Sequence, residues 1–384
     1  MIKLVVTDID DTLVCRERRV ITKRGQAAMH ALIDAGVVVG PATGRDIYRV
    51  GYSFRFDHEL YSTAVVANGM KVYYEGEKVL ERELPLEGLA KVAKLCTTDE
   101  RAGLLLFDDT GRIWIAGTTL DDAIEHDLRH LPTADGVSEE LPEGRRAVKA
   151  NCHFDGRTED LLAFMHELAW ACPELDFTCP VGGIIDITVH GWDKGEATLW
   201  LADQLGISHD EICAFGDAGN DEALIEKIPN SVAVANGFED IIAKACWHIG
   251  TSFDDSVSAA FEDIAEAAKT GSMPAFMDPA VDERYRKLAE SLTFAMPKGI
   301  DSYERAVPSR CALIWFTSIS SATWFSPPTG MIMSAYFFEG STKASCIGFT
   351  VVRYWSMTEE RLRPRSSTSR RMRRKILTSA SVST

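Results

Sequence analysis

The sequence predicts a doubly wound α/β fold in which a smaller α+β domain is inserted into a core built on a parallel sheet. In residues 1–81 and 190–271, short apolar runs such as KLVVT at residues 3–7 alternate with helical stretches. Strands separated by helices form a parallel sheet that is covered by helices on both faces. Residues 82–189 differ, because their expected strands are joined by hairpin-like turns. Residues 272–384 follow neither pattern, so we expect an atypical basic tail of uncertain structure.

The first part of the core begins with the buried strand at residues 3–7. Thr22 is expected to cap a helix that continues to about Ala35, since a threonine hydroxyl can accept from the free amides of the first turn. Gly36 is expected to end this helix, because glycine adopts the left-handed conformation that closes helices. Further strands are expected at residues 37–40 and 64–67, with a hairpin at 71–81.

The inserted domain and the second part of the core complete the expected path of the chain. In residues 82–189 the pattern predicts strands at 104–107, 113–116, 148–154, 175–179 and 184–189, helices at 120–131 and 159–171, and a loop at 132–145. After Asp193 it predicts strands at 212–215 and 231–235, and helices at 194–205, from about Asn220, at 239–244 and at 254–269. Binding sites of such sheets lie at the carboxyl ends of the strands.

Composition and charge limit the classes of partner. The chain has 384 residues, 46% of them hydrophobic and 26% charged, with a formal net charge of −16. Residues 1–271 carry 25 Lys and Arg against 48 Asp and Glu, whereas residues 272–384 carry 16 against 9. An acidic main body argues against nucleic acid as its partner, because phosphate backbones are bound by an excess of Lys and Arg.

The cysteines and the N-terminus favour a cytoplasmic protein. The nine cysteines are scattered, odd in number and never in C-x-x-C spacing, which does not suit a disulfide framework or a zinc site. Met1 leads directly into the first apolar run, without the basic region and cleavage site of a signal peptide. No membrane attachment is expected, and the sequence leaves the oligomeric state unknown.

The first motif that carries chemistry follows the first strand and contains Asp8, Asp10 and Thr12. A carboxylate can attack phosphorus and form a covalent intermediate. A second carboxylate two residues on points to the same side of an extended chain, where it could protonate a leaving alcohol and then activate water. The alternative is a pair of acidic turn residues at the end of a strand.

Two further motifs supply groups that suit a phosphate. Thr43 and Gly44 follow the strand at 37–40, and hydroxyl and amide donors at a helix start bind phosphate oxygens. Lys194 stands in the first turn of a helix, where a cation is unfavourable unless an anion lies nearby. The alternatives are a plain helix cap at Thr43 and a solvated surface lysine.

The fourth motif follows the strand at 212–215 and contains Asp217, Asn220 and Asp221. Two acids and an asparagine around a turn between strand and helix suit a hard cation with oxygen ligands, such as Mg²⁺. The alternative is a Gly-Asp turn in which Asn220 caps the next helix.

Taken together, the four motifs resemble the haloacid dehalogenase (HAD) superfamily phosphatases, and specifically the Cof-like subgroup. In that subgroup D-x-D-x-T, T-G-R, K-G and G-D-x-x-N-D occur in this order, and all four are present in residues 1–271. The turn Ala67-Asn68-Gly69 also resembles the S-N-G turn of the subgroup. The resemblance implies a Rossmann-like HAD core, at 1–81 and 190–271, with an inserted cap domain at 82–189.

The resemblance also implies roles for the residues that bind and cleave the phosphate ester. Asp8 would be the nucleophile and Asp10 the general acid and base. Thr43 and the backbone of Gly44 would hold the phosphoryl oxygens, and Lys194 would neutralise the charge of the phosphate and of Asp8.

The remaining roles concern the cofactor, which the resemblance gives as Mg²⁺. Mg²⁺ would be held by the Asp8 side chain, the Asp10 backbone carbonyl and Asp217. Asp221 would support these ligands, and Asn220 would contact the phosphate. Without a cation these carboxylates would repel one another and the substrate.

Two departures from the subgroup's pattern are visible. Asp11 stands where many members have glycine, and Val234-Ala235-Asn236-Gly237 replaces a more familiar M-G-N-A turn. Neither change removes a catalytic group. The expected function is therefore a Mg²⁺-dependent phosphatase of small phosphorylated metabolites, with sugar phosphates favoured. The alternatives are a phosphoryl-transfer enzyme of the phosphomutase type and a non-catalytic binding module that uses the basic tail.

The tail offers weaker signals. Residues 281–294 could form an amphipathic helix, and residues 311–338 carry no charge. That uncharged stretch is long enough to span a bilayer, but its Ser and Thr residues and Pro327-Pro328 argue against a spanning helix. Residues 361–375 hold eight Arg or Lys and could be an arm for nucleic acid or anionic lipid. A disordered, solvated tail and a shifted reading frame are the alternatives.

Overall fold

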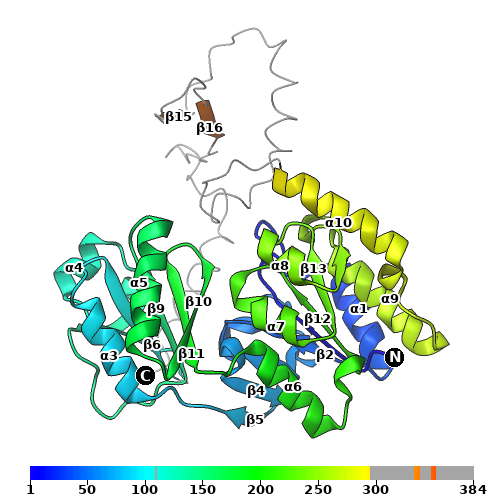
Figure 1. Ribbon diagram of the computed structural model, residues 1–384, viewed down its shortest axis with the longest axis horizontal. Coiled ribbons are helices and arrows are strands. Elements are labelled where there is room, and N and C mark those ends of the chain that lie inside the picture. Colours follow the sequence, from blue (N-terminus) through cyan, green and yellow to red (C-terminus); the bar gives the residue numbers. More distant parts are fainter. Residues whose placement is uncertain (109, 295–332, 338–346, 352–384) are drawn as a thin grey trace, which may run out of the picture. The chain divides into compact units, whose positions relative to one another are not determined.

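The computed structural model describes residues 1–108, 110–294, 333–337 and 347–351 (Figure 1). Its contacts divide the chain into two units, Met1–Val307 and Pro308–Thr384, and each is described by itself. Among the described residues, no helix has the length and apolar character needed to cross a membrane.

The central sheet of the first unit has five parallel strands in the order β14-β13-β12-β1-β2. These strands are β1 (Leu4–Thr7), β2 (Val38–Pro41), β12 (Ile212–Gly216), β13 (Asn230–Val234) and β14 (Trp247–Ile249). Thr7 at the end of β1 is in register with Phe215 of β12 and Pro41 of β2. The carboxyl ends of these three strands therefore lie side by side at one edge of the sheet.

Helices cover both faces of this sheet (Figure 1). They include α1 (Lys23–Asp34), α6 (Lys194–Leu205), α7 (Glu222–Lys227) and α9 (Ser256–Thr270). Val5 of β1 shares an apolar cluster with Met29 of α1 and Phe261 of α9, whereas Leu4 shares another with Leu201 of α6. Because successive strand residues point to opposite faces, α1 and α9 cover one face and α6 and α7 the other. This is the doubly wound arrangement that the sequence predicts.

The first helix shows why the local signals were readable. The Thr22 side chain accepts a hydrogen bond from the amide of Gly25 at 2.8 Å, so α1 begins at Lys23. Gly36 follows the helix with a φ of 78°, a left-handed conformation that glycine adopts without a steric penalty.

Smaller elements extend the core. Strands β3 (Ala64–Val66), β4 (Lys71–Tyr74) and β5 (Glu77–Glu81) form an antiparallel sheet. The helices α2 (Ile47–Val50), α8 (Glu239–Lys244) and α10 (Pro279–Phe294) complete this part. Asp282 of α10 accepts from the backbone amide of His248 in β14 at 2.8 Å. The helix expected at 281–294 is therefore present and packs against the edge strand of the central sheet.

The second sheet has six strands in the order β10-β11-β9-β6-β7-β8, antiparallel except for the pair β7 and β8. Its strands are β6 (Ala102–Phe107), β7 (Ile113–Ala116), β8 (Ala134–Ser138), β9 (Lys149–Phe154), β10 (Leu175–Val181) and β11 (Ile184–Val189). The helices α3 (Leu86–Cys96) and α5 (Thr158–Ala171) pack on one face, where Leu89 and Leu168 share an apolar cluster with Cys152. A shorter helix, α4 (Leu120–Glu125), packs near the other face through Ala123 and Leu105.

Several elements differ from the sequence-based prediction. The helix predicted at 120–131 ends at Glu125, because Asp127 and His130 adopt positive φ values of 43° and 73°, which no α-helix contains. The predicted loop at 132–145 contains strand β8, whose Gly-containing sequence has little strand preference and which forms through pairing with β7. The structure also contains three elements that were not predicted at all, namely the helices α2 and α3 and the short edge strand β14.

Beyond α10, the structure describes only two short segments of the tail. In the second unit, β15 (Met333–Phe337) and β16 (Ile347–Val351) form an antiparallel pair. The remainder of the uncharged stretch 311–338 and the basic stretch 361–375 lie outside the described residues.

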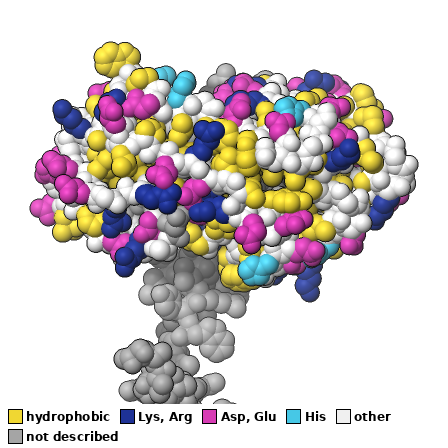
Figure 2. Space-filling model, turned by 90° about the horizontal axis from the view of Figure 1, so that it is seen from below, with side chains coloured by type: hydrophobic (Ala, Val, Ile, Leu, Met, Phe, Trp, Pro, Cys, Tyr) yellow, Lys and Arg dark blue, Asp and Glu magenta, His cyan; other side chains and the backbone are white. Residues whose placement is uncertain are grey.

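On the face of the molecule shown in Figure 2, acidic and basic side chains are interspersed, with apolar side chains between them.

Candidate active site

The parallel strands bring the four motifs to one edge of the central sheet. Asp8 directly follows β1, and its backbone amide donates to the carbonyl of Phe215 in β12 at 2.9 Å. Thr43 lies two residues beyond β2 and Asp217 directly follows β12. The structure therefore places the predicted site residues of separate motifs next to one another, as the strand ends require.

Lys194 lies at the centre of this arrangement. Its ammonium donates to Asp8 Oδ1 at 2.8 Å and to Asp221 Oδ1 at 2.6 Å, and its side chain is 0% exposed. The position is fixed by Asp193, which caps α6 by accepting from the amide of Glu196 at 2.9 Å. A lysine in the first turn of a helix is unfavourable unless an anion lies nearby. The carboxylates of Asp8 and Asp221 are these anions.

Burial sets the electrostatics of these groups. Desolvation raises the pKa of Asp8 to about 7, although the neighbouring Lys194 acts to lower it. Burial also holds the pKa of Asp217 well above its usual value, and the charges of Asp221 and Asp8 add to that effect. Burial alone would lower the pKa of Lys194, but Asp221 and Asp8 outweigh it and the pKa is raised. One ammonium therefore does not compensate three buried carboxyl groups.

The donor set suits a divalent cation. Carboxylate oxygens of Asp8, Asp217 and Asp221 lie within 4.8 Å of one another, and all three residues are buried. We call these residues the buried acidic cluster. Hard oxygen donors of net negative charge are the ligands that Mg²⁺ prefers. The chemistry of the residues present therefore fits the metal that the resemblance implies.

The partners within the cluster differ between its members. Asp221 Oδ2 accepts from the amides of Asp217 and Ala218 at 3.1 and 3.2 Å, in addition to the contact of Oδ1 with Lys194. Asp217 Oδ1 accepts from the Thr12 hydroxyl at 2.5 Å. Both oxygens of Asp221 thus accept hydrogen bonds from protein groups. These contacts suit a residue that stabilises the loop carrying Asp217 and Ala218. The Thr12 hydroxyl was part of the first motif but was not among the predicted site residues.

Asp10 points toward a different partner. Its carboxylate accepts from Arg45 Nε at 2.8 Å and from Arg45 Nη2 at 2.5 Å, and it is 60% exposed. Arg45 also donates to the Ser53 hydroxyl at 2.8 Å. A bidentate guanidinium fixes the orientation of a carboxylate. Arg45 is the third residue of the T-G-R motif, so the signal was present although no role was predicted for it.

The first motif's departure from the subgroup has a structural reason. Asp11 adopts a φ of 60°, the left-handed region that glycine occupies readily and aspartate tolerates better than most residues. The Asp11 carboxylate accepts from the Arg16 amide at 2.9 Å and pairs with the Arg16 guanidinium at 2.6 Å. Asn236 of the variant V-A-N-G turn donates to the Asp11 carbonyl at 2.9 Å. Local contacts therefore hold the strained position.

The residues of the second and fourth motifs that were predicted to bind phosphate meet around Asn68. Thr43 is buried, and Asn220 Nδ2 donates to Asn68 Oδ1 at 3.4 Å. A Cβ atom on Gly44 would lie 3.0 Å from Asn68 Oδ1 and 3.3 Å from Asp186 Oδ2. Gly44 is therefore closely covered by a residue of the core and a residue of the second sheet.

Several residues near the site were not predicted from the sequence. They are Arg45, Asn68, Lys149, Asn151 and Asp186, and each is joined by hydrogen bonds to a motif residue or to another member of this set. Asn68 was singled out only as part of a turn. Lys149, Asn151 and Asp186 belong to the second sheet and are part of no local motif. Whether they lie near the site depends on which face of that sheet is turned toward the core.

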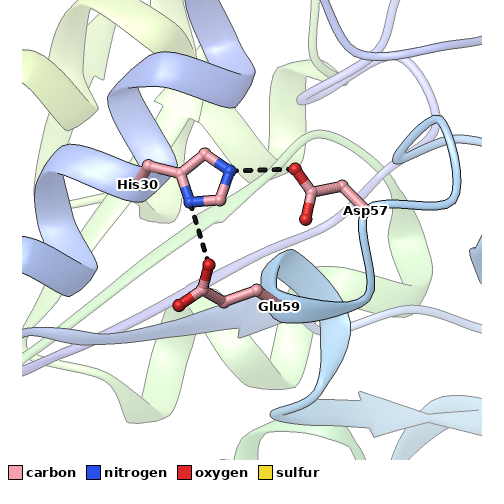
Figure 3. A group of neighbouring side chains, drawn as sticks. All are labelled: His30, Asp57 and Glu59. Carbon is pink, nitrogen blue, oxygen red and sulfur yellow. Dashed lines mark hydrogen bonds and ion pairs between the residues drawn. The ribbon is translucent and has the colours of Figure 1, made fainter.

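A second cluster of titratable groups lies apart from the motifs. His30 of α1 contacts Asp57 through Nε2 at 2.8 Å and Glu59 through Nδ1 at 3.2 Å (Figure 3). We call these residues the surface histidine cluster. The two ring nitrogens face different carboxylates, Nε2 that of Asp57 and Nδ1 that of Glu59 (Figure 3). The geometry is that of an imidazole held between two carboxylates.

Comparisons with known proteins identify relatives. A family model described as haloacid dehalogenase-like hydrolase matches residues 5–261. An HMP-PP phosphatase of Enterobacter sp. (strain 638) is 25% identical over 249 residues, which cover 64% of this chain and 88% of that protein. An HMP-PP phosphatase of Yersinia pseudotuberculosis serotype O:1b is 26% identical over 249 residues, covering 63% of this chain and 86% of that protein.

Solved structures share the fold. A protein from Streptococcus mutans UA159 has a TM-score of 0.60 at 20% identity, covering 69% of this chain and 100% of its own. A phosphatase of the HAD superfamily from Bacteroides thetaiotaomicron has a TM-score of 0.59 at 22% identity, with coverage of 68% and 94%. A sugar phosphatase of HAD subclass IIB has a TM-score of 0.58 at 22% identity, with coverage of 68% and 98%.

Proposed function

The chain belongs to the haloacid dehalogenase-like hydrolase family, and from that membership we propose a Mg²⁺-dependent phosphatase of small phosphate monoesters, sugar phosphates foremost. The observation that carries the proposal is the buried contact of Asp8 with Lys194 at the end of β1, beside Asp217. The curated relatives are named HMP-PP phosphatases and one structural neighbour is titled a sugar phosphatase, which supports small phosphorylated metabolites as the substrate class.

In the first step, a carboxylate oxygen of Asp8 attacks the phosphorus, and the bond between phosphorus and the leaving-group oxygen breaks. Asp10 gives its proton to that oxygen, so the leaving group departs as a neutral alcohol. The product on the enzyme is an aspartyl phosphate at Asp8. Lys194 offsets the charge that Asp8 and the phosphoryl oxygens bring into the buried site.

In the second step, a water molecule attacks the phosphorus of the aspartyl phosphate. Asp10, now a carboxylate, takes the proton of that water, and the bond between phosphorus and the Asp8 oxygen breaks. Inorganic phosphate leaves and Asp8 is restored. Arg45 suits this step, because its two hydrogen bonds hold the Asp10 carboxylate in a fixed orientation.

Phosphate and cation have separate places in this proposal. Thr43, the backbone of Gly44 and Asn220 would hold the phosphoryl oxygens. Asp8, Asp217 and the backbone carbonyl of Asp10 would hold Mg²⁺, with Asp221 fixed by Lys194 and by backbone amides as their support. When bound, Mg²⁺ would supply positive charge that favours the ionised form of these acids and offsets the charge of the phosphate.

The cysteines agree with the proposed cytoplasmic location. Those among the described residues, from Cys15 to Cys246, form no disulfide bond with one another, which suits a reducing compartment.

The first experiment measures phosphate release from a panel of sugar phosphates and from p-nitrophenyl phosphate, with Mg²⁺ or with EDTA. We expect release that requires Mg²⁺ and that Asp8→Asn abolishes, because an amide oxygen is a poor nucleophile and a weaker ligand. Asp57→Asn is the matched control, since it makes the same change at the surface histidine cluster. It should keep wild-type activity.

The outcomes separate the candidate functions. Release without Mg²⁺, or release that survives Asp8→Asn, would overturn the proposal. A phosphorylated sugar that returns as its isomer, without free phosphate, would favour the phosphomutase alternative, in which a second hydroxyl replaces water.

A further inference from the structure

The helix α10 lies outside the segment that the family model matches. That segment ends at residue 261, whereas α10 spans Pro279–Phe294. The helix nevertheless packs on the core, beside α8 (Figure 1). Ala289 of α10 is 0% exposed and shares an apolar cluster with Ile242 of α8 and with Ala235. The place of this helix in the chain must therefore be explained by its own contacts.

A buried pair of polar side chains fixes α10 on β14. Asp282 Oδ1 accepts from the backbone amide of His248 at 2.8 Å and lies 2.9 Å from His248 Nδ1. On the other side of the ring, Nε2 donates to the carbonyl of Ile242 at 2.8 Å, since a carbonyl oxygen can only accept. The side chains of His248 and Asp282 are only 5% and 12% exposed. Buried polar groups whose partners are all present hold their elements in one arrangement, so α10, β14 and α8 are joined.

The backbone that follows β14 connects α10 to the V-A-N-G turn at 234–237. A Cβ atom on Gly250 would lie 3.4 Å from the ring of Tyr285, so α10 lies against the backbone of Gly250. The carbonyl of Gly250 accepts from the amide of Ala235 at 3.2 Å. Ala235 also belongs to the apolar cluster of Ala289. The helix therefore supports this turn both through Gly250 and by direct packing.

On its other side, the turn contacts the two loops of the candidate site. The amide of Phe238, the residue after the turn, donates to the carbonyl of Asp217 at 2.8 Å. Asn236 Nδ2 donates to the carbonyl of Asp11 at 2.9 Å. Asp217 is a proposed ligand of Mg²⁺, and Asp11 directly follows Asp10, whose backbone carbonyl is another. The turn therefore bonds to the backbone of both loops that would carry cation ligands.

We propose that α10 is a positioning element for the proposed Mg²⁺ site and acts through the turn at 234–237. Mg²⁺ accepts little deviation from its preferred geometry, so the backbone that carries its ligands must have little freedom. Contacts beyond the ligands themselves commonly change metal affinity by about 10- to 100-fold. The identity of the cation rests on the proposed phosphatase function, whereas the support of the turn by α10 does not.

Simple coverage of apolar surface is the competing explanation. Without α10, Ile241 and Ile242 of α8 would lose part of their apolar cluster, so the helix could serve stability alone. Coverage predicts a lower free energy of unfolding and an unchanged response of the folded protein to Mg²⁺. A positioning element predicts a weaker response to Mg²⁺ while the protein remains folded.

The test disturbs α10 in the full-length chain with Ala289→Glu, which places a carboxylate in the buried contact with α8. We expect the Mg²⁺ concentration that half-saturates phosphate release to rise about 10-fold or more, with KM for the ester within about 3-fold of wild type. In EDTA, hydrogen exchange of the Phe238 amide should accelerate about 10-fold or more, because opening of α10 releases the turn. The amide of Asp8, which bonds to β12, is the internal reference and should keep its wild-type exchange rate.

A milder variant and a matched control complete the design. Asp282→Asn keeps an acceptor for the His248 amide but removes the charge beside the imidazole, so both effects should appear at about 3-fold. Ser291→Glu introduces a carboxylate at an exposed position of α10 and should match wild type in both measurements.

The outcomes separate this inference from the proposed function. Variants that are folded by circular dichroism, and in which either quantity keeps its wild-type value, would overturn the positioning role. If Ala289→Glu does not fold, Asp282→Asn against Ser291→Glu decides in the same way. Wild-type protein that releases no phosphate from any ester would count against the proposed phosphatase function, and exchange of the Phe238 amide would then decide alone whether α10 holds the turn.

Discussion

The buried acidic cluster and the surface histidine cluster contain similar side chains in very different surroundings. Each has three titratable groups whose ligand atoms lie within 4.8 Å of one another. In the surface histidine cluster, His30, Asp57 and Glu59 are 38%, 29% and 59% exposed, so water screens their charges. In the buried acidic cluster every member is buried, and burial raises the pKa values of Asp8 and Asp217.

The difference shows that proximity alone does not make a catalytic site. An exposed ion pair contributes about 0–1 kcal/mol to the free energy of unfolding, because its charged groups are solvated nearly as favourably by water in the unfolded state. Buried charges carry a desolvation cost of several kcal/mol, which only good partners offset. The carboxylates of the buried acidic cluster therefore depend on Lys194 and, in the proposed function, on Mg²⁺. The members of the surface histidine cluster instead pair with one another.

The largest expected effect is that of removing the one buried ammonium. Lys194→Met leaves Asp8 and Asp221 without their shared donor. We expect kcat to fall by at least about 10²- to 10³-fold, as for loss of a preorganised charge-stabilising donor. In EDTA, we expect the free energy of unfolding at pH 8 to fall by about 3–5 kcal/mol, because buried carboxylates lose their counter-charge. Phosphate release and urea denaturation measure the two effects.

A surface lysine provides the control for that comparison. Lys244 pairs with Glu226 at 2.7 Å, but its side chain is 36% exposed. Lys244→Met should leave both the free energy of unfolding and turnover close to those of wild type, because an exposed ion pair contributes little to stability. Equal stability losses in the two variants would show that burial does not distinguish the two lysines.

The next effect concerns Mg²⁺ and pH. In metal-free protein the pKa of Asp8 is raised from its unfolded value of 3.8 to about 7, so the folded state binds the proton more tightly than the unfolded state. Stability is then lost as pH rises between these values, by roughly 1 kcal/mol per pH unit. Mg²⁺ requires the ionised ligands, so its stabilising effect should be larger at pH 8 than at pH 6. Thermal denaturation with Mg²⁺ or EDTA at both pH values measures the difference.

Variants of the two clusters assign that effect. Asp8→Asn should reduce the Mg²⁺-dependent increase in melting temperature and remove most of the difference in this increase between pH 6 and pH 8. Asp57→Asn should alter neither quantity. An increase of equal size at pH 6 and pH 8, or one that Asp57→Asn removes, would contradict the assignment to the buried acidic cluster.

Much of the fold followed from local signals in the sequence. The family, the doubly wound fold and the phosphatase class were predicted from the motifs and are confirmed by the comparisons. The helix predicted at 194–205 and the strand predicted at 184–189 agree with α6 and β11. Caps, periodicity and apolar runs act over a few residues, so one sequence displays them. The predicted domain boundaries stay predictions.

The candidate site was only half predictable. The residues of the motifs lie at strand ends, where topology alone brings Asp8, Asp217 and Thr43 together. Asp186 and Lys149 lie within strands whose pattern shows alternation but not which face covers the core. The pairing of Asp10 with Arg45 was also missed, because it depends on how the second motif's loop turns back toward the first. The roles of the motif residues stay predictions.

The smallest expected effect is that of a substitution in the surface histidine cluster. His30→Gln removes an imidazole held between Asp57 and Glu59 (Figure 3). We expect the free energy of unfolding to fall by less than about 1 kcal/mol, because all three groups are solvated and glutamine can still donate to one carboxylate. Turnover and the Mg²⁺-dependent increase in melting temperature should equal those of wild type. A variant that loses the Mg²⁺ effect would place a cation at the surface histidine cluster, and proximity of ligands would then matter more than their burial.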